Sequence, residues 1–258
     1  IIASRGTVVT PPILGLMASL GIIKIPVFKR PKIAIISTGD ELLDISEPLR
    51  PGKIRNSNSH TLAAYCRGIG AEPIILATPK DKIEEVGKMI EHGLQQADMV
   101  ITTGGVSVGD YDVLGEAVDY IGAETLYWKI EIKPGSPNLA AVKDRKVILS
   151  LSGNPAAALV IFHLLGILFI KKMAGRTDYL PIKTEVTLKD DFRKASPRRR
   201  FLRGKLVIEK GTALMEITGE QGNGVLRSLI GCNLLAEIPE GSKPQKAGTK
   251  LNAYLIDE

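Results

Sequence analysis

Apolar runs and amphipathic stretches alternate over the first two thirds of the chain. The apolar runs are continuous, which is typical of strands that are covered on both faces. The stretches between them place apolar side chains at helical spacing. Strands and helices in this alternation predict an α/β fold with a doubly wound, mainly parallel sheet. The expected strands are 32–38, 72–78 and 97–103, and the expected helices are 58–70, 81–96 and 111–122.

The pattern changes toward the C-terminus. Residues 139–153 have the pattern of a β-hairpin, and a long apolar helix is expected from about Pro155 to Met173. Short alternating segments, separated by glycine, proline and aspartate, then predict a small all-β domain. We therefore divide the chain into a helix with a linker (1–30), an α/β domain (31–178) and a C-terminal β domain (179–258).

The composition is that of a soluble globular protein, with 44% hydrophobic and 24% charged residues. Two distant cysteines without a C-x-x-C pair suggest buried thiols in a reducing compartment. The three histidines lack metal-ligand spacing, so we expect no zinc site. The apolar run 156–170 is shorter than a bilayer span and carries His163, which we interpret as a core histidine of a buried helix. No secretory signal opens the sequence, and we expect a cytoplasmic protein.

The net charge of +6 is concentrated in one segment. Nine basic residues and three acids lie between Lys183 and Lys205. Such a run could face nucleic acid, bind a small anion or form a solvated edge, and taken alone it favours the solvated edge. Aromatic residues make up only 5% of the chain and do not interleave with the basic run, which argues against stacking on a single strand.

Four loops that leave expected strand ends carry the candidate chemistry. They are 37–42, 78–81, 102–112 and 150–155, and all contain glycine, proline or hydroxyl residues. The carboxyl ends of strands in an open α/β sheet form one crevice. Backbone N–H groups at such ends suit an anion, and the acids of neighbouring loops then require a hard cation such as Mg²⁺. The pattern predicts a phosphate-bearing ligand that is held together with magnesium.

A plainer interpretation exists for each loop by itself. Thr38 and Thr103 could cap helices, Asp40 and Asp112 could be first-turn acids, and the glycines could simply turn the chain. For a single loop this is the better interpretation. For four loops at one edge of a sheet, the ligand site is the better one.

Two lysines add a possible basic side to this site. Lys129 and Lys133 are four residues apart on an expected strand, so both would face the same side and suit an oxyanion. A solvated strand face is an equal alternative on spacing alone. Asn154 and Pro155, which precede an alanine-rich stretch, form a good helix start under either interpretation.

Four motifs, in order along the chain, resemble one protein family. They are STGDEL (37–42), TTGGVSVGDYD (102–112), IKPG (132–135) and SGNPAAA (152–158). Each is weak alone, but in this order and followed by a β domain they resemble the molybdopterin molybdenumtransferases. These proteins are called MoeA in bacteria and also form the C-terminal part of gephyrin. The resemblance extends to GTVVTPPILGLMASLGI near the start and to RRRFLRGKL and QGNGVLRSL in the β domain, so it covers essentially the whole chain.

The resemblance implies an enzyme of molybdenum cofactor biosynthesis. It would insert molybdate, or tungstate, into adenylylated molybdopterin and release AMP, with Mg²⁺ assisting. The implied catalytic residues are Asp112, Glu41, Lys129 and Lys133, and the implied metal ligands are Asp40, Glu41, Asp81 and Asp112. The residues implied to bind substrate are Thr38, Gly39, Thr103, Gly104, Gly105, Ser107, Gly153, Asn154, Pro155, Arg199, Arg203 and Ser228.

The resemblance also implies an assembly. Family members are elongated homodimers whose cleft joins the α/β domain of one subunit to the β domain of the other, so Arg199, Arg203 and Ser228 would serve the second subunit's cleft. No nucleic-acid or membrane partner is implied. The sequence departs from the family in having Ser152 where many members have proline. Family members carry two further N-terminal domains, and this sequence starts near the end of that region. Two alternatives stay open, a molybdopterin adenylyltransferase and a non-catalytic binding scaffold.

Overall fold

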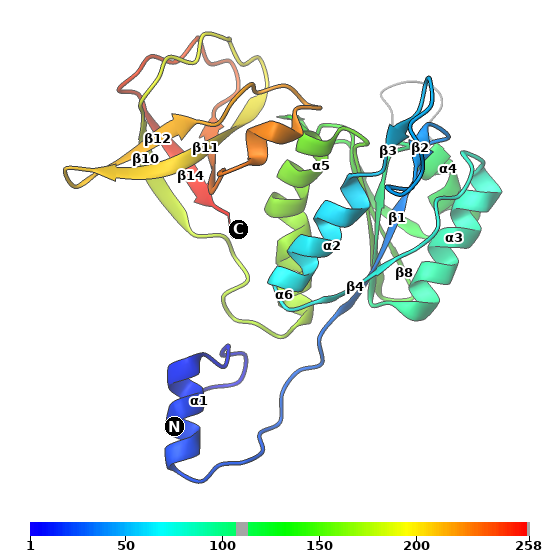
Figure 1. The fold of residues 1–258 in the computed structure, drawn as a ribbon, viewed down its shortest axis with the longest axis horizontal. Coiled ribbons are helices and arrows are strands. Elements are labelled where there is room, and N and C mark those ends of the chain that lie inside the picture. The colour runs from blue at the N-terminus through cyan, green and yellow to red at the C-terminus, as the bar shows by residue number, and fades with distance from the viewer. Residues whose placement is uncertain (107–112, 257–258) are drawn as a thin grey trace.

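A six-stranded sheet forms the centre of the first domain (Figure 1). The computed structural model describes residues 1–106 and 113–256. The strand order is β4-β1-β5-β9-β8-β6, in which the first four strands are parallel and β8 and β6 are each antiparallel to the strand before, so the sheet is mixed. The strands are β1 (Lys32–Ser37), β4 (Glu72–Ile75), β5 (Met99–Thr103), β6 (Glu124–Trp128), β8 (Leu139–Lys143) and β9 (Lys146–Leu151).

Helices cover both faces of this sheet. Alternate residues of β1 belong to two separate cores, Ile33 and Ile35 to the one that contains α2 and α5, and Ala34 and Ile36 to the one that contains α3 and α4. This follows from the period of two along a strand and explains why the run is apolar without a break. The expected strands and helices of this region are present, with shifts of a few residues at their ends. The helices are α2 (Asn58–Gly68), α3 (Ile83–Gln96), α4 (Val113–Tyr120) and α5 (Pro155–Ile161).

The hairpin expected from the sequence consists of β8 and β9. Asp144 and Arg145 connect the two strands with φ values of 50° and 63°, and two consecutive positive φ values are the requirement of a type I′ turn. Because β8 is antiparallel to both of its neighbours, β6 runs in the same direction as β9. The register places Trp128, Ser150 and Thr102 in one row across the sheet. The residues that follow them therefore leave the sheet at the same edge.

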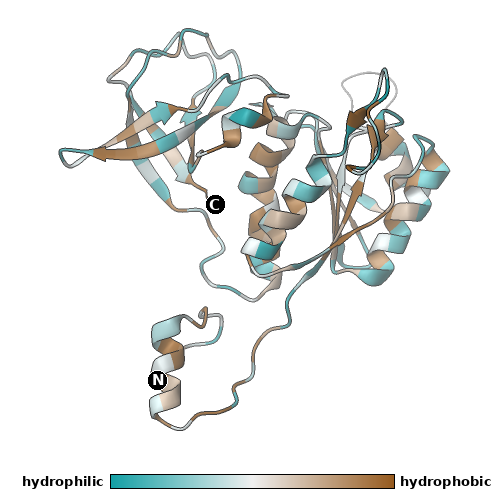
Figure 2. Ribbon diagram, in the orientation of Figure 1, coloured by the Kyte–Doolittle hydropathy of each residue, from teal (hydrophilic) through white to brown (hydrophobic). Residues whose placement is uncertain are grey.

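One 19-residue helical run, Pro155–Met173, lies between the sheet and the second domain (Figure 2). It comprises α5, the π-helical turn η1 (Phe162–Gly166) and α6 (Ile167–Met173). In the described part of the chain, this is the helix that is long and apolar enough to cross a membrane, with a mean hydropathy of 1.9 over 18 residues. However, 61% of that 18-residue stretch is buried inside the protein. The prediction of a buried helix from about Pro155 to Met173 is confirmed. His163 is 4% exposed and meets the Tyr65 ring edge-on, as a core histidine does.

The second domain is a closed β-barrel with the strand order β12-β10-β14-β13-β11, in which β11 also pairs with β12. A short strand of the α/β domain, β7 (Ile132–Lys133), pairs in parallel with the start of β11. Phe201, Leu235 and Ile256 on the outside of the barrel join the core that contains α5, so the two domains share buried surface. The barrel elements are β10 (Lys183–Leu188), β11 (Arg199–Glu209), β12 (Thr212–Ile217), β13 (Leu234–Ile238), β14 (Lys250–Leu255) and the 3₁₀ turn η2 (Leu226–Leu229).

The N-terminal segment lies apart from the body of the molecule (Figure 1). Its helix α1 (Pro11–Ser19) follows Thr10 and stops before Gly21, whose φ is 69°, as the proline and glycine predict. An extended linker then leads into β1. Of the residues of α1, only Met17 is buried.

Candidate functional site

Three of the four predicted loops touch one another at the carboxyl edge of the sheet. At Gly104, where φ is 91°, an added Cβ would lie 2.2 Å from the carbonyl oxygen of Thr38. At Gly153, an added Cβ would lie 3.3 Å from the Cα of Gly104. Asn58 of α2 donates from Nδ2 to the carbonyl oxygen of Gly153 at 2.9 Å. Glycine is therefore required here so that the loops can cross, and their convergence, which the sequence predicts, is observed.

These loops line a cavity of about 670 Å³. The structure brings together eight of the predicted site residues there: Thr38, Glu41, Thr103, Gly104, Gly105, Gly153, Asn154 and Pro155. It adds residues that the sequence analysis missed, notably Arg55, Asn56 and Asn58 before and within α2, and Gly224 and Leu226 of the barrel. The barrel residues lie about 70 positions beyond Asn154, so local pattern carries no sign of their arrival.

A buried hydroxyl network supports the floor of the cavity. Ser37 Oγ lies 2.7 Å from Ser59 Oγ and 2.9 Å from Thr103 Oγ1, and it donates to Asn56 Oδ1 at 3.1 Å. Asn56 in turn accepts from the Ser59 N–H, so β1, β5 and the start of α2 are tied together. The buried Oγ1 of Thr38 has no hydrogen-bond partner among the described residues. The hydrogen bonds among Ser37, Asn56, Ser59 and Thr103, which do not include Thr38, fix the loop geometry before any ligand arrives.

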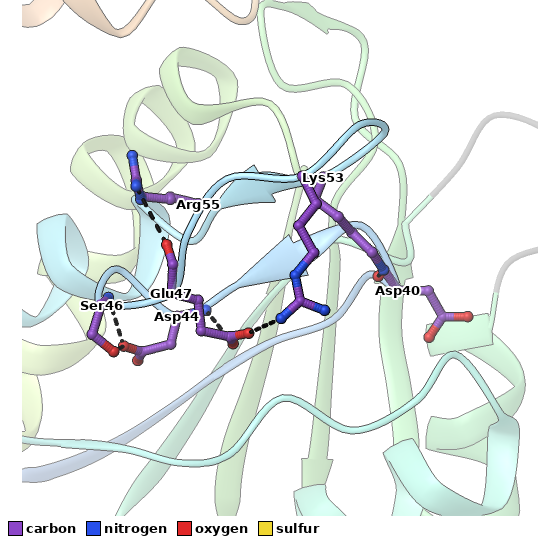
Figure 3. A network of polar contacts seen from close by, with 7 residues as sticks. Asp40, Asp44, Ser46, Glu47, Lys53 and Arg55 are labelled. Carbon is purple, nitrogen blue, oxygen red and sulfur yellow. Dashed lines mark hydrogen bonds and ion pairs between the residues drawn. The ribbon is translucent and has the colours of Figure 1, made fainter.

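A short arm, formed by β2 (Leu42–Leu43) and β3 (Ile54–Arg55), carries the first group of acids. Gly39 has a φ of 139°, and an added Cβ there would lie 2.7 Å from the Glu41 carboxylate oxygens, so this glycine makes room for that carboxylate. Lys53 Nζ donates to the carbonyl oxygen of Asp40. The Asp40 carboxylate points away from the other polar side chains of the arm (Figure 3). The sequence analysis assigned no element to this arm.

The predicted acids do not all face one space. Glu41 lines the cavity of about 670 Å³, whereas Gly39 and Asp40 line a neighbouring cavity of about 430 Å³. The backbone N–H of Asp40 donates to Asp81 Oδ2 at 3.4 Å, so these two loops also meet. Burial, followed by the charges of Asp40 and Glu41, raises the pKa of the Asp81 carboxyl, although the Asp40 N–H opposes the change. Three carboxylates thus lie close enough to repel one another.

Two predicted site residues lie outside the described part of the chain, Ser107 and Asp112. Among residues 1–106 and 113–256, no group of three or more histidine, cysteine or acidic side chains is arranged to hold a metal ion. The chemistry of Asp40, Glu41 and Asp81 nevertheless suits Mg²⁺, because carboxylate oxygens are its preferred ligands and a cation would offset the burial and, to a smaller extent, the neighbouring charges that raise the pKa of Asp81.

The prediction that Lys129 and Lys133 share one face of a strand is wrong. β6 ends at Trp128, and Lys129 has a φ of 64°, which no strand residue adopts. Lys133 belongs to β7 and pairs with Arg200 at the barrel. Both lysines still lie on the segment that leaves the sheet at the edge where the loops converge, and Lys129 Nζ sits 3.8 Å from the centre of the Trp128 ring.

The three predicted residues of the barrel differ in exposure. Arg199 is exposed and its Nε lies 3.1 Å from Glu237 Oε1. Arg203 and Ser228 are fully buried. Burial lowers the pKa of Arg203 to about 10, and its Nη2 donates to the carbonyl oxygens of Glu220 and Gly222 at 3.4 and 3.0 Å. In this chain the last two are buried, Arg203 beneath the loop 218–226 on the outside of the barrel and Ser228 in η2, and their service to a second subunit stays a prediction.

The cysteines are free and buried, as expected from their spacing. Burial raises the pKa of the Cys66 thiol to about 12 and also raises the pKa of Cys232. A thiol that stays protonated is a poor nucleophile and metal ligand, so neither cysteine takes part in the site.

Comparison with known families shows the origin of this arrangement. A family model described as a probable molybdopterin binding domain matches residues 34–172, more than half of the chain. A second, described as the MoeA C-terminal region (domain IV), matches residues 185–256. The chain belongs to the MoeA family. The regions that match the two models meet at the larger cavity, since Asn154 lies in the first and Gly224 in the second.

Individual relatives agree with this family. The chain is 35% identical over its whole length to a molybdopterin molybdenumtransferase from Staphylococcus aureus (strain N315) and 34% identical to one from Bacillus subtilis (strain 168). It spans 61% and 60% of the length of these relatives. Among solved structures, it is similar to a molybdopterin biosynthesis MoeA protein from Pyrococcus horikosii, with a TM-score of 0.85, 28% identity, and coverage of 100% of this chain and 62% of that one.

Proposed function

We propose that this MoeA-family chain takes part in inserting molybdate, or tungstate, into adenylylated molybdopterin with release of AMP. The observation that supports this most is the meeting of three glycine- and hydroxyl-rich loops beside a carboxylate at one cavity of about 670 Å³. Its volume falls within the range of small-molecule sites. The family and its named relatives supply the chemistry of the substrate.

Each part of the substrate has suitable neighbours in this proposal. The backbone N–H groups of Gly105 and Gly153, with the unpartnered Thr38 hydroxyl, bind phosphate or molybdate oxygens, while Gly104, whose N–H donates to the Leu151 carbonyl oxygen, lets the loops approach closely. Lys129 and Lys133 approach from the segment after β6 and stabilise negative charge on those oxygens as the phosphate link is broken. Ser107 completes the glycine-rich loop in this assignment.

Mg²⁺ is the cofactor in this proposal, and molybdate or tungstate is a substrate. Asp40, Glu41 and Asp81 would hold the cation together with Asp112. When bound, it would neutralise charge on the phosphate oxygens. Of the chain's own residues, Lys53 holds the backbone of Asp40 in place, and Gly39 leaves space for the Glu41 carboxylate.

The assembly is proposed to be a cytoplasmic homodimer in which each cleft is completed by the other subunit. Arg199 is the barrel residue best suited to such a role, because its side chain is 57% exposed at the start of β11. Its present partner, Glu237, is only 17% exposed and also accepts the Tyr254 hydroxyl, so Glu237 keeps a partner when Arg199 turns to a ligand.

Release of AMP from adenylylated molybdopterin tests the proposal directly. Purified protein is mixed with the substrate, Mg²⁺ and molybdate, and AMP is measured with and without molybdate. We expect release that depends on molybdate and falls by about a hundredfold in Glu41→Gln, because a charged group next to the reacting phosphate is lost. Glu84→Gln is the matched control, since Glu84 is an exposed residue of α3 that pairs only with Lys88.

Other results would favour the alternatives. Formation of adenylylated molybdopterin from ATP and molybdopterin, without molybdate, would indicate an adenylyltransferase. Absence of AMP release under every condition would overturn the enzymatic proposal and favour a binding scaffold. Equal activity of Glu41→Gln and Glu84→Gln would remove Glu41 from the site.

A further inference from the structure

One barrel loop, residues 218–226, reaches the larger cavity, and two side chains attach it to β11: Arg203, which donates to the carbonyl oxygens of Glu220 and Gly222, and Gln221. Gln221 accepts the Arg203 N–H at its Oε1 (2.9 Å). Its Nε2 donates to the carbonyl oxygens of Arg203 at 3.1 Å and of Thr218 at 2.9 Å. The side chain thus pairs with both backbone groups of one residue in β11, as a neighbouring strand would. Gln221 fastens the loop to the barrel.

The far side of the same loop is bonded to the α/β domain. The carbonyl oxygen of Asn223 accepts the N–H of Ala157 at 3.1 Å. Ala157 is the third residue of α5, and N–H groups in the first turn of a helix have no acceptor inside the helix. The loop therefore supplies the missing acceptor. Beside this bond, Gly224 lies against Asn154, whose Oδ1 would be 3.6 Å from a Cβ added to that glycine.

The two attachments place the loop at the cavity while Gln221 stays outside it. Gly224 and Leu226 line the cavity, and Gln221 does not. Gln221 can therefore influence a ligand only through the backbone that it holds. The path runs from β11 through Gln221 to Asn223, and from there to the helix that begins at Pro155.

We infer that Gln221 is a positioning residue, which sets the barrel wall of the cavity and couples it to the start of α5. This inference rests on the proposed function for its effect on catalysis but not for its effect on structure. Loss of the Gln221 side-chain bonds leaves residues 219–225 attached to β11 only through the Arg203 side chain and the Thr218 N–H, and this looser loop weakens the Asn223–Ala157 bond and widens the substrate site. The reacting groups on the α/β side stay in place.

The Ala157 amide is a direct reporter of this coupling. Gln221→Met keeps the length of the side chain and removes its hydrogen bonds. Gln245→Met is the matched control, because Gln245 is also a half-buried barrel glutamine whose Nε2 donates to a nearby carbonyl, that of Lys243, and it does not line the cavity. Gln221→Glu serves as a second variant that keeps the acceptor and loses only the donor.

Amide hydrogen exchange of the intact protein, read by NMR, is compared with steady-state kinetics. We expect the Ala157 amide to exchange about tenfold faster in both Gln221 variants and at the parental rate in Gln245→Met. We also expect KM to rise severalfold with kcat near the parental value, because binding is weakened and the reacting groups are not. A purely structural role would lower the amount of folded protein and leave KM unchanged.

Two results overturn the inference. One is an unchanged Ala157 exchange rate in Gln221→Met, and the other is faster exchange with an unchanged KM. Failure of the proposed function is recognised separately, because parental protein would then release no AMP while the exchange rates would still show whether Gln221 holds the loop.

Discussion

The two walls of the larger cavity are built in different ways. On the α/β side, backbone crosses backbone, and Gly104 is in contact with both Thr38 and Gly153. Buried hydroxyls beneath these loops bond to one another. On the barrel side, one loop reaches the cavity, and one backbone bond, from Ala157 to Asn223, joins it to the opposite wall.

This difference assigns a rigid and an adjustable side to the site. Close packing leaves the α/β loops no alternative arrangement, because their contacts are already at the limit that glycine permits. The barrel as a whole is also fixed, since Phe201 and Leu235 share a core with α5. Residues 218–225 are attached to the barrel mainly by hydrogen bonds that involve Gln221 and Arg203, whereas Leu226 packs against the core that contains α5. For the substrates proposed above, a large pterin nucleotide and a small oxyanion, a site gains from having one wall of each kind.

Breaking the rigid wall gives the largest expected effect. Gly104→Ala places a methyl group 2.2 Å from the Thr38 carbonyl oxygen at a φ of 91°. Since the obstacle is backbone, it cannot move aside as a side chain would. We expect the free energy of unfolding to fall by about 4 kcal/mol, measured by urea denaturation.

Gly122→Ala is the control for the backbone conformation alone. Gly122 also has a positive φ, 67°, but no atom lies within 4 Å of an added Cβ. Only the conformational penalty of about 1 to 2 kcal/mol remains. If the two variants lose equal stability, the contact of Gly104 with the Thr38 backbone adds nothing to the cost, and close backbone contact does not make the α/β wall rigid.

A smaller effect is expected at the segment that links the two walls. Asn138 is fully buried, and its side-chain Nδ2 donates to the backbone carbonyl oxygens of Gly135 and Ser136. The backbone carbonyl oxygen of Asn138 accepts the Lys129 N–H. This organises the turn that leads from β6 to β7. Asn138→Leu leaves the buried Gly135 carbonyl without this partner, while the Ser136 carbonyl keeps the Ile130 N–H, and we expect a loss of about 2 kcal/mol in urea denaturation.

Asn252→Leu is the matched control, because Asn252 is an exposed residue of β14. Its stability should stay within about 0.5 kcal/mol of the parent. Asn138→Leu should also lower AMP release, since the two lysines depend on the turn. A stable and fully active Asn138→Leu protein would show that this link does not position them.

The sequence predicts the parts of this molecule that depend on local pattern. Continuous apolar runs identify β1 and β5, and the glycine-rich ends of these strands identify the loops that meet at Thr38, Gly104 and Gly153. This succeeds because the carboxyl ends of parallel strands must lie at one edge, so that strand order hardly matters.

The parts that the sequence did not predict depend on contacts between distant segments. Lys129 looks like a strand residue by spacing, but the chain must leave the sheet there to reach the barrel, and a positive φ achieves this. The β2–β3 arm has only two residues in each strand, too few to show an alternation. Arg203 looks like part of a solvated basic edge, yet it is buried, because the loop that carries Gln221 folds over it.

The smallest expected effect concerns the two thiols and sharpens the contrast between the walls. Cys66 lies in α2 beside the rigid wall, and Cys232 lies just after η2, where its N–H donates to Leu229. Burial raises the pKa of both thiols above the ordinary value of 9.0, so alkylation at pH 8 requires an opening that restores ionisation. Both thiols belong to the core that contains α5. Opening at Cys232 requires the turn after η2 to lift from that core, whereas opening at Cys66 requires the whole helix α2 to separate from it.

We therefore expect iodoacetamide to modify Cys232 at least about tenfold faster than Cys66 under native conditions, as measured by mass spectrometry of the digested protein. Both rates should increase with pH up to the ordinary thiol pKa of 9.0, because the open state ionises there, and Gln221→Met should accelerate only Cys232. Equal rates for the two thiols in the parent would mean that both walls open together in global unfolding. The barrel loop would then be as firmly held as the crossed backbones opposite it.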